Sequence, residues 1–514
     1  MNIPYYLKVG RFSDLKDKKE RIIYRALEIL PGGASWLTLA LIVLLSWLEP
    51  VWMAVFTMVF VIYWLFRTFY FSFHLSACYR QMKKHEKIDW LEKLKTLPAH
   101  HSSWQSIYHL IVLPTHQEPL EIIRETFFSL LKSDYPKDKM FVVLACEERA
   151  GEKTREAAEM IGREFKDKFG KLLVTFHPDN LPGEIKGKGA NESWGARQAK
   201  NLIIDPLRIP YKNVIFSSFD VDTCVFPKYF SCLTHHYLTV ESPIRASFQP
   251  VPLFINNIWQ APPISRVFSF SATFWQMMCQ ERPEKLLTFS SHSMSFQALV
   301  DVDFRQTNVV SDDSRIFWQC FLKYDGDYRV VPLYYPISMD ANVAPTFFRT
   351  IKNVYKQQRR WAYGAGDVAY FIFGFLKNKK IPLNKKISLG GSVFEGHWSW
   401  ATNSIMIFLL GWLPLLLGGE SFSQTILSYN LPQLTSRLLT LAMLGLLGSV
   451  YFSMMMLPPK PPSLGKKKYL FFVLEWFLLP VVMIFFTSLP ALDAQTRWIF
   501  GKYMGFWVTP KIRK

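Results

Sequence analysis

The sequence predicts an α/β domain with a mostly parallel sheet, inserted between α-helical transmembrane segments. Half of the 514 residues are hydrophobic and 16% are aromatic, and the apolar residues gather in blocks towards both ends of the chain. Between these blocks, short β-branched runs alternate with charged stretches of helical length. Lys and Arg lie beside the apolar blocks, as the positive-inside rule requires of a membrane protein. A soluble domain framed by membrane helices explains all three observations.

Five apolar blocks are predicted to span the membrane. Basic residues flank the first pair on its outer sides, whereas the turn Glu49-Pro50 within the pair and the later loop 418–436 contain none. This asymmetry places the N-terminus and the middle domain in the cytoplasm and the loop outside. The alternative for the first pair is a buried helical hairpin. The blocks are Ser35–Leu48, Val51–Leu65, Trp398–Leu417, Leu438–Leu457 and Tyr469–Leu489.

The C-terminal tail conflicts with this topology. A fifth span would leave the tail outside, yet its basic residues favour the cytoplasm. A re-entrant or interfacial segment over Gln495–Trp507 would remove the conflict. The basic residues are Arg497, Lys502, Lys511, Arg513 and Lys514.

These patterns divide the chain into seven segments. One of them, a basic amphipathic stem, is expected to contact membrane lipid. The segments are a cytoplasmic N-terminal segment (1–34), two transmembrane helices (35–73), the stem (74–104), the α/β domain (105–345), interfacial helices (346–396), three transmembrane helices (397–489) and a basic interfacial tail (490–514).

The net charge of +19 arises largely from residues beside the apolar blocks. No basic stripe interleaved with aromatic residues stands out in the middle domain, so we expect no nucleic-acid partner. The six cysteines form no Cys-x-x-Cys pair and lie in segments placed inside the cell, which predicts free thiols.

The middle domain alternates strands and helices. This order predicts a mostly parallel sheet covered by helices, with ligands at the carboxyl ends of the strands. The predicted strands are Leu110–Leu113, Met140–Ala145, Leu172–Phe176 and Val214–Phe216, and the predicted helices are Leu120–Leu131 and Glu152–Lys168. The aromatic stretch Gln249–Gln280 shows no clear period and is a candidate lining for an acceptor cleft.

Polar residues follow three of these strands. Asp220 and Asp222 come after the last strand, where an extended segment would project both carboxylates to one side. Such oxygens suit Mg²⁺ or Mn²⁺ carrying a diphosphate. Thr115 and Glu118 follow the first strand, and Glu147 follows the second. The alternative for each acid is a solvated loop carboxylate.

Two further stretches carry candidate chemistry. The loop around Lys188, rich in Gly and Lys, could cradle a diphosphate, although such loops are commonly just flexible turns. Ser311, Asp312 and Asp313 precede an apolar helix over 316–322. Ser311 or Asp312 would cap this helix, which leaves one acid free to take a proton from an acceptor hydroxyl.

Gln357, Arg360 and Trp361 lie one helical turn apart on a predicted basic interfacial helix. The indole can stack on a sugar ring, while Gln and Arg can bind hydroxyls or a leaving diphosphate. A surface-helix anchor explains the Trp alone equally well.

Taken in order, these motifs resemble the membrane-embedded family-2 glycosyltransferases, the group of cellulose, chitin and hyaluronan synthases. The resemblance covers residues 105–365 by motif and the remainder by layout. It rests on Pro114-Thr115-x-x-Glu118-Pro119, Lys188 with Asn191, Asp220-x-Asp222, Asp312-Asp313 and Gln357-x-x-Arg360-Trp361.

The resemblance implies a GT-A-like, nucleotide-sugar-binding domain, a UDP-sugar donor, a Mg²⁺ or Mn²⁺ cofactor and inverting transfer. Two departures are Ser311-Asp312-Asp313 where the family has Thr-Glu-Asp, and Glu147-Glu148 where it has an Asp pair. The implied roles are nucleoside binding for Thr115, Glu118 and Glu147; diphosphate binding for Lys188; donor and metal binding for Asp220; metal binding for Asp222; the base for Asp313; and acceptor or diphosphate binding for Asp312, Gln357, Arg360 and Trp361.

Three functions remain open at this point. The leading one is a processive enzyme that polymerises a sugar and threads it through its own helices. The second is addition of a single sugar to a lipid carrier or glycolipid. The third is a non-catalytic subunit of a polysaccharide export complex, against which the intact acids argue. The sequence leaves the sugar, the linkage, the acceptor and the oligomeric state undetermined.

Overall fold

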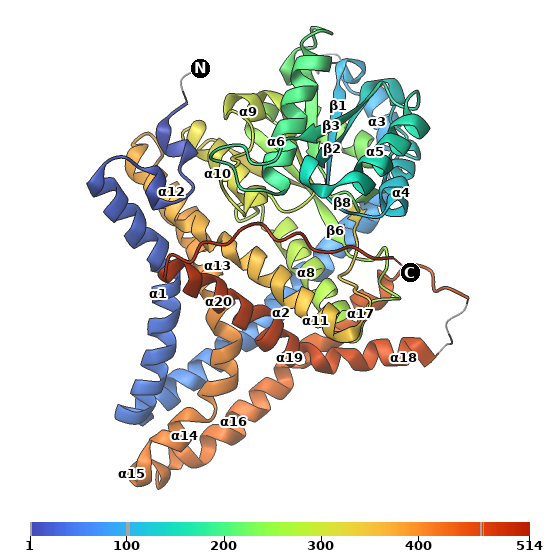
Figure 1. Cartoon of the computed structure of the whole chain (residues 1–514). Coiled ribbons are helices and arrows are strands. Elements are labelled where there is room, and N and C mark those ends of the chain that lie inside the picture. Colours follow the sequence, from blue (N-terminus) through green and yellow to red (C-terminus); the bar gives the residue numbers. More distant parts are fainter. Residues whose placement is uncertain (1–2, 99–102, 463–464, 466, 514) are drawn as a thin grey trace.

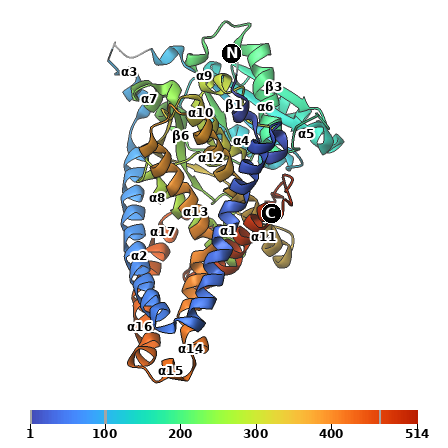
Figure 2. The ribbon, with the colours of Figure 1, turned by 90° about the vertical axis from the view of Figure 1, so that its left-hand side faces the viewer.

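The computed structural model describes residues 3–98, 103–462, 465 and 467–513. An α/β domain sits at one end of a set of long helices, which extend away from it (Figures 1 and 2). The predicted fold class is therefore confirmed: a mostly parallel sheet, covered by helices, lies between long apolar helices at both ends of the chain.

One mixed sheet organises the domain, in the order β3-β2-β1-β4-β7-β6-β8-β5. β1 pairs in parallel with β2 and β4, β2 with β3, and β6 with β8, whereas β7 and β5 pair antiparallel with their neighbours. The strands are β1 (Tyr108–Thr115), β2 (Met140–Glu147), β3 (Lys171–His177), β4 (Val214–Ser218), β5 (Cys224–Val225), β6 (Ala246–Leu253), β7 (His292–Ser295) and β8 (Arg329–Ser338).

Both faces of the sheet are covered, which explains why β1, β2 and the start of β4 are continuous apolar runs. In β1, Leu110 and Val112 enter one core and Ile111 and Leu113 enter the other. The helices from α3 to α12 are α3 (Trp90–Lys95), α4 (Leu120–Leu131), α5 (Glu152–Phe165), α6 (Lys188–Ala199), α7 (Tyr229–Thr239), α8 (Pro263–Gln280), α9 (Phe296–Asp301), α10 (Asp312–Lys323), α11 (Phe347–Ala362) and α12 (Asp367–Lys377).

The order of the sheet reverses beside β1. The chain passes from β1 outward to β2 and β3, then returns to place β4 on the other side of β1. Such a switch point opens a crevice at the carboxyl ends of the two central strands. Thr115 ends β1 and Asp220 follows β4, so the predicted polar residues border this crevice.

Four helical segments in the described part of the chain are long and apolar enough to cross a membrane: 18–48, 50–87, 426–455 and 467–499. The predicted span 398–417 is not among them, because the helix there ends at Leu410. The helices outside the domain are α1 (Lys18–Leu48), α2 (Pro50–Lys87), α13 (Leu383–Leu410), α14 (Leu413–Leu417), α15 (Gly419–Ser423), α16 (Ile426–Ala442), α17 (Leu444–Met455), α18 (Lys467–Leu474), α19 (Leu479–Met483) and α20 (Leu489–Ile499).

Short 3-10 or π-helical turns connect several elements. They are η1 (Tyr5–Lys8), η2 (Phe12–Asp14), η3 (Trp104–Ser106), η4 (Lys137–Lys139), η5 (Glu148–Ala150), η6 (Lys200–Ile204), η7 (Tyr211–Asn213), η8 (Pro243–Arg245), η9 (Tyr363–Gly366), η10 (Glu475–Leu478) and η11 (Ile484–Ser488).

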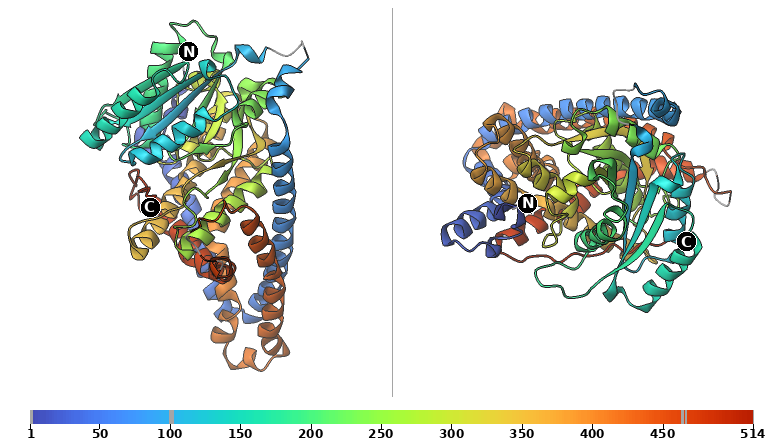
Figure 3. Two further views of the ribbon diagram at one scale, coloured as in Figure 1. Left: turned by 90° about the vertical axis from the view of Figure 1, so that its right-hand side faces the viewer. Right: turned by 90° about the horizontal axis from the view of Figure 1, so that it is seen from above.

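The last helical segment runs across the others rather than beside them. η10 and the π-turn η11 break it between α18 and α20, and α18 lies crosswise to α1 (Figures 1 and 3). After Gly501, whose φ is +62°, the tail returns along the α/β domain (Figure 1). The tail therefore lies at the domain end, whereas α14 and α15 lie at the far end (Figure 2).

Element prediction succeeded where the pattern was clean. α4 has the predicted bounds, and β1, β2, β3 and β4 contain their predicted cores. The stretch 249–280, which shows no period in the sequence, contains the end of β6 and all of α8. Pro250 and Pro252 inside β6 hide that strand, because proline is rare within sheets.

We predict that the loop between α14 and α16 and the α/β domain lie on opposite sides of the membrane. A cysteine replacing the exposed Gln424 should react with a membrane-impermeant maleimide added to intact cells. A cysteine replacing the exposed Lys153 of α5 should react only after the cells are opened. The unsubstituted protein controls for the native cysteines. Equal labelling of both positions in intact cells would contradict this arrangement.

Candidate active site

Asp220 and Asp222 lie in a tight turn directly after β4. The Thr223 amide donates a hydrogen bond to the Asp220 carbonyl oxygen over 2.8 Å, so the segment is a turn and the predicted extended conformation is wrong. Val221 between them is 1% exposed and belongs to the hydrophobic core, so it points away from the acids. Within this turn the two acids pair with different cations, Asp220 with Lys188 and Asp222 with Lys511.

Lys188, the first residue of α6, joins two of the predicted motifs. Its Nζ lies 2.8 Å from Oδ1 of Asp220 and 2.9 Å from Oδ1 of Asp313. Ser290 donates a hydrogen bond of 2.6 Å to the second oxygen of Asp220. The Lys188 side chain is only 9% exposed, so this ammonium is held among carboxylates away from bulk water.

Asp312 and Asp313 open α10 and share the guanidinium of Arg305. Arg305 Nη1 lies 2.6 Å from Asp312, 3.0 Å from Asp313 and 2.9 Å from Glu192. The Asp313 side chain is 24% exposed, whereas that of Asp312 is 3% exposed. Asp313 is therefore the member of the pair that a ligand can reach.

Ser311 occupies the predicted N-cap position of α10, but its side chain does not make the predicted capping hydrogen bond. Its hydroxyl donates instead to Asp367 over 3.2 Å, because that carboxylate, at the start of α12, faces it.

Residues from the C-terminal tail close the other side of the site. Lys511 forms an ion pair with Asp222, whose second oxygen accepts a hydrogen bond of 3.0 Å from the Asp340 amide. Arg513 Nη2 lies 2.6 Å from Asp340 Oδ1. The Arg360 guanidinium of α11 stands over the Phe506 ring, 4.6 Å from its centroid.

Burial and neighbouring cations set the charges of these acids. For Asp220 and Asp313, burial opposes ionisation. Lys188 acting together with a second cation, Lys511 for Asp220 and Arg305 for Asp313, nevertheless lowers the pKa of each acid, that of Asp313 to about 2. For Asp222, burial and the charge of Asp220 raise the pKa in spite of Lys511. An additional positive charge near Asp222 would therefore favour its ionised form.

The predicted nucleoside residues lie along the same edge of the sheet. Thr115 Oγ1 donates to Glu118 Oε2 over 2.8 Å, and the His116 amide donates to the same oxygen over 2.7 Å. Asn191 of α6 donates to the Ala145 carbonyl over 2.6 Å. These bonds fix the ends of β1 and β2 against the helix that carries Lys188.

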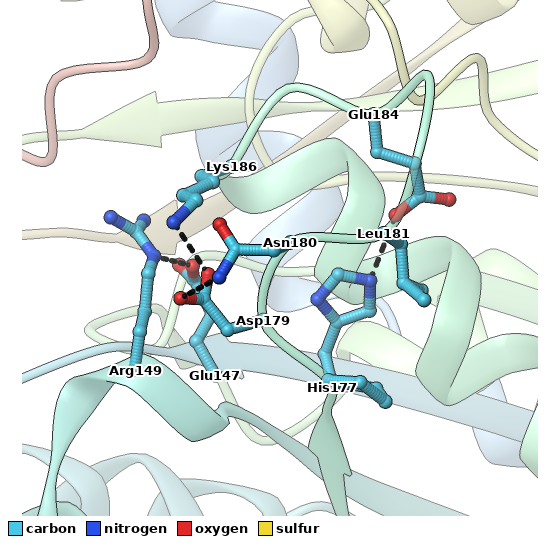
Figure 4. A pocket seen from close by; sticks show the side chains of 9 residues that line it. Glu147, Arg149, His177, Asp179, Asn180, Leu181, Glu184 and Lys186 are labelled. Carbon is cyan, nitrogen blue, oxygen red and sulfur yellow. Dashed lines mark hydrogen bonds and ion pairs between the residues drawn. The ribbon is translucent and has the colours of Figure 1, made fainter.

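A pocket of about 230 Å³ lies beyond β1, at the carboxyl ends of β2 and β3. Glu147 points into it from the end of β2 and pairs with Arg149 (Figure 4). Beside this pair, Lys186 Nζ lies 2.7 Å from Asp179 Oδ1 (Figure 4). The pocket is lined by polar groups that can exchange these partners for a ligand.

The residues predicted on one face of α11 have different surroundings. Arg360 experiences the charges of the site acids, while burial lowers its pKa. Gln357 Oε1 accepts a hydrogen bond of 3.2 Å from Asn342. Trp361 is partly buried among the rings of Phe254, Phe268 and Phe289, with centroids 5.5 to 6.2 Å away.

The structure thus brings Lys188, Asp220 and Asp313 into direct contact, with Asp312 and Asp222 bordering them. Sequence reasoning missed Glu192, Arg305, Asp340, Lys511 and Arg513. Two of them carry a usable signal: Glu192 lies one helical turn after Lys188, and Asp340 follows a strand. No sequence pattern points to Arg305, because residues 303 and 304 before it adopt positive φ angles outside any regular element.

The donor set fits a divalent cation. Asp220 and Asp222 present carboxylate oxygens next to Asp340, and such hard oxygens suit Mg²⁺ or Mn²⁺. The Lys511 ammonium lies against Asp222 and supplies positive charge there. A metal ion and Lys511 would compete for the same carboxylate.

No family model matches this chain, and no curated protein matches it. Among solved structures, the chain is similar to a mannosyltransferase from Pyrobaculum calidifontis in complex with GDP-Man and Mn²⁺, with a TM-score of 0.42 and 16% identity, over 76% of this chain and 99% of that one. It is also similar to S. aureus TarS 1-349 in complex with UDP-GlcNAc (TM-score 0.32, 14% identity, 68% and 92% of the two chains). A third similarity is to GalNAc-T7 with UDP, GalNAc and Mn²⁺ (TM-score 0.33, 10% identity, 57% and 58%).

We predict that Lys511→Ala strengthens divalent-cation binding. Removing the ammonium leaves Asp222 without its ion pair, so Mn²⁺ should bind several-fold more tightly in the absence of donor. The measurement is a Mn²⁺ titration followed by electron paramagnetic resonance. Lys502→Ala, which removes an exposed lysine from the same tail, is the matched control. Unchanged or weaker Mn²⁺ binding by Lys511→Ala would show that Asp222 is not a metal ligand.

Proposed function

We propose that this protein is an inverting glycosyltransferase that moves a sugar from a nucleotide-sugar donor onto a growing polysaccharide at the cytoplasmic face of a membrane. The observation that carries the proposal is the enclosed acidic site at the switch point of the sheet, in which Lys188 bridges Asp220 and Asp313. The choice of UDP as the nucleotide, and of a polysaccharide as the product, rests on the family resemblance.

The donor would lie along the carboxyl edge of the sheet. Its nucleoside would contact Thr115, Glu118 and Glu147, beside the pocket that Glu147 lines. Its diphosphate would lie over Lys188 and near Arg360, because these cations meet at the acids beyond β4. A divalent ion held by Asp220 and Asp222 would neutralise the diphosphate as it departs.

Asp313 would act as the base. In the structure Lys188 and Arg305 hold its pKa near 2, which makes the carboxylate a weak proton acceptor. A bound diphosphate would attract Lys188 and weaken its pairing with Asp313, so the basicity of Asp313 would rise when donor is present. Asp313 would then take the proton of an acceptor hydroxyl as that oxygen attacks the anomeric carbon opposite the leaving diphosphate.

The acceptor would approach along α11. This helix packs against α20, and Arg359 Nη1 lies 2.9 Å from Asp493 Oδ2, which connects the helix to the apolar segments. Trp361 would stack on the terminal sugar, and Gln357 would help to position its hydroxyls. Asp312, whose buried carboxylate holds Arg305, would support the acceptor site indirectly. An acceptor chain held there extends towards the membrane helices, as a secreted polymer requires.

The direct test is to supply the purified, membrane-reconstituted protein with a panel of radiolabelled nucleotide sugars and to size the products. Release of UDP with a long polymer supports the proposal. A product carrying one added sugar on a lipid would instead show single addition. Failure to transfer from every donor, under conditions in which the protein is folded, would favour a non-catalytic subunit.

We predict that Asp313→Asn lowers the transfer rate by about 10²–10⁴ at saturating donor. The amide keeps the shape of the side chain but cannot accept the hydroxyl proton, so donor affinity should change little. Asp312→Asn is the comparison, since its carboxylate is buried against Arg305 and its loss should affect folding more than proton transfer. An inactive Asp312→Asn beside an active Asp313→Asn would mean that the base is the other acid.

We predict that Trp361→Ala shortens the product far more than it weakens UDP binding. The indole is proposed to contact the acceptor sugar, whereas the donor lies at the edge of the sheet. Trp361→Phe, which keeps an aromatic face among the neighbouring Phe rings, should retain most of the length. UDP affinity and product length are measured on the same preparations. Weakened UDP binding with unchanged product length would refute this assignment.

A further inference from the structure

A cluster of soft ligands joins the end of α2 to α7, outside the acidic site. His85 lies in the last turn of α2, while Cys232 and His236 lie one turn apart on α7. One ring nitrogen from each histidine and the Cys232 sulfur lie within 4.8 Å of one another. The three residues come from two elements far apart in the sequence, so helical periodicity alone does not explain their meeting.

Both imidazoles are anchored through Nδ1 on a backbone carbonyl. Nδ1 of His85 lies 2.9 Å from the Leu333 carbonyl oxygen, and Nδ1 of His236 lies 2.8 Å from the Cys232 carbonyl oxygen. A carbonyl only accepts, so each Nδ1 carries the proton and each Nε2 keeps its lone pair. Anchoring one ring nitrogen on a backbone carbonyl fixes the tautomer that binds a metal through the other.

The Nε2 atoms have no competing partner within the described ranges: the hydrogen bonds of these two rings there involve Nδ1. The Cys232 sulfur lies 3.6 Å from Nδ1 of His236. The Trp90 ring borders the cluster, with its centroid 5.2 Å from the His85 and His236 rings. Its Nε1 donates to the His85 carbonyl over 2.9 Å, which keeps that wall in place.

We propose that His85, Cys232 and His236 form a zinc site that fastens α2 to the α/β domain. One thiolate and two imidazoles are the ligands Zn²⁺ favours, in contrast to the all-oxygen acidic site. On binding, the Cys232 thiol releases its proton to solvent, both imidazoles remain neutral, and water completes a tetrahedral site. The ion would fix the angle at which α2, the longest apolar helix, meets α7 (Figure 2).

The first test measures zinc stoichiometry in the Asp222→Asn background, so that the acidic site contributes less. After equilibration with Zn²⁺ and gel filtration, mass spectrometry of the metal should find about one zinc per chain. His85→Gln and His236→Gln should weaken zinc binding by at least about tenfold. His74→Gln, on the same helix as His85, and Cys320→Ala, a buried thiol elsewhere, should retain the zinc.

A second measurement reports on the sulfur itself. Co²⁺ in place of Zn²⁺ should give a thiolate-to-cobalt charge-transfer band, which Cys232→Ala abolishes and Cys320→Ala keeps. His85 is only partly buried, so His85→Gln keeps the test valid even where Cys232→Ala fails to fold. Zinc content at background level in the parent protein, or equal content in His85→Gln and His74→Gln, would overturn the site.

Discussion

The structure depends on keeping several carboxylates charged in a buried place. Asp220, Asp222 and Asp313 come from two separate turns, and each would be costly to bury without a cation. Lys188 supplies that cation to Asp220 and Asp313, and Arg305 supplies one to Asp312 and Asp313. These pairs hold α6, α10 and the end of β4 together, so the same interactions that stabilise the domain build the proposed catalytic site.

The C-terminal tail completes this balance. Lys511 forms an ion pair with Asp222, an acid whose pKa is raised by burial and whose ionised form a positive charge therefore favours. A donor with its metal ion would bring a different cation to the same carboxylate. Binding of the donor and departure of the tail lysine would therefore be coupled. Lys511 and Arg513, two of the basic residues that made the tail difficult to place from the sequence, lie beside the site acids.

Much of the fold could be predicted from the sequence, because β1 to β4 are apolar runs bounded by clear turns. β6 and β8 could not be predicted, because each contains two prolines and neither shows a regular alternation of apolar and polar residues. The conformation of Asp220-Val221-Asp222 was predicted wrongly for a different reason. The motif shows which residues carry charge and that Val221 points away from them, but it does not show that the backbone turns here, with the Thr223 amide bonded to the Asp220 carbonyl.

The candidate site could be predicted where the residue type itself indicates the chemistry, as it does for Asp220, Asp222 and Lys188. The partners that decide the charge of those groups, Arg305 and Lys511, come from an irregular loop and from the end of the chain, and no local pattern connects them to the acids.

The most direct test of the central claim is a structure determined with UDP and Mn²⁺, using the anomalous signal of manganese. Our account predicts a manganese peak against Asp220 and Asp222 with Lys511 displaced from Asp222. A peak elsewhere, with the Lys511–Asp222 pair intact beside bound UDP, would contradict it.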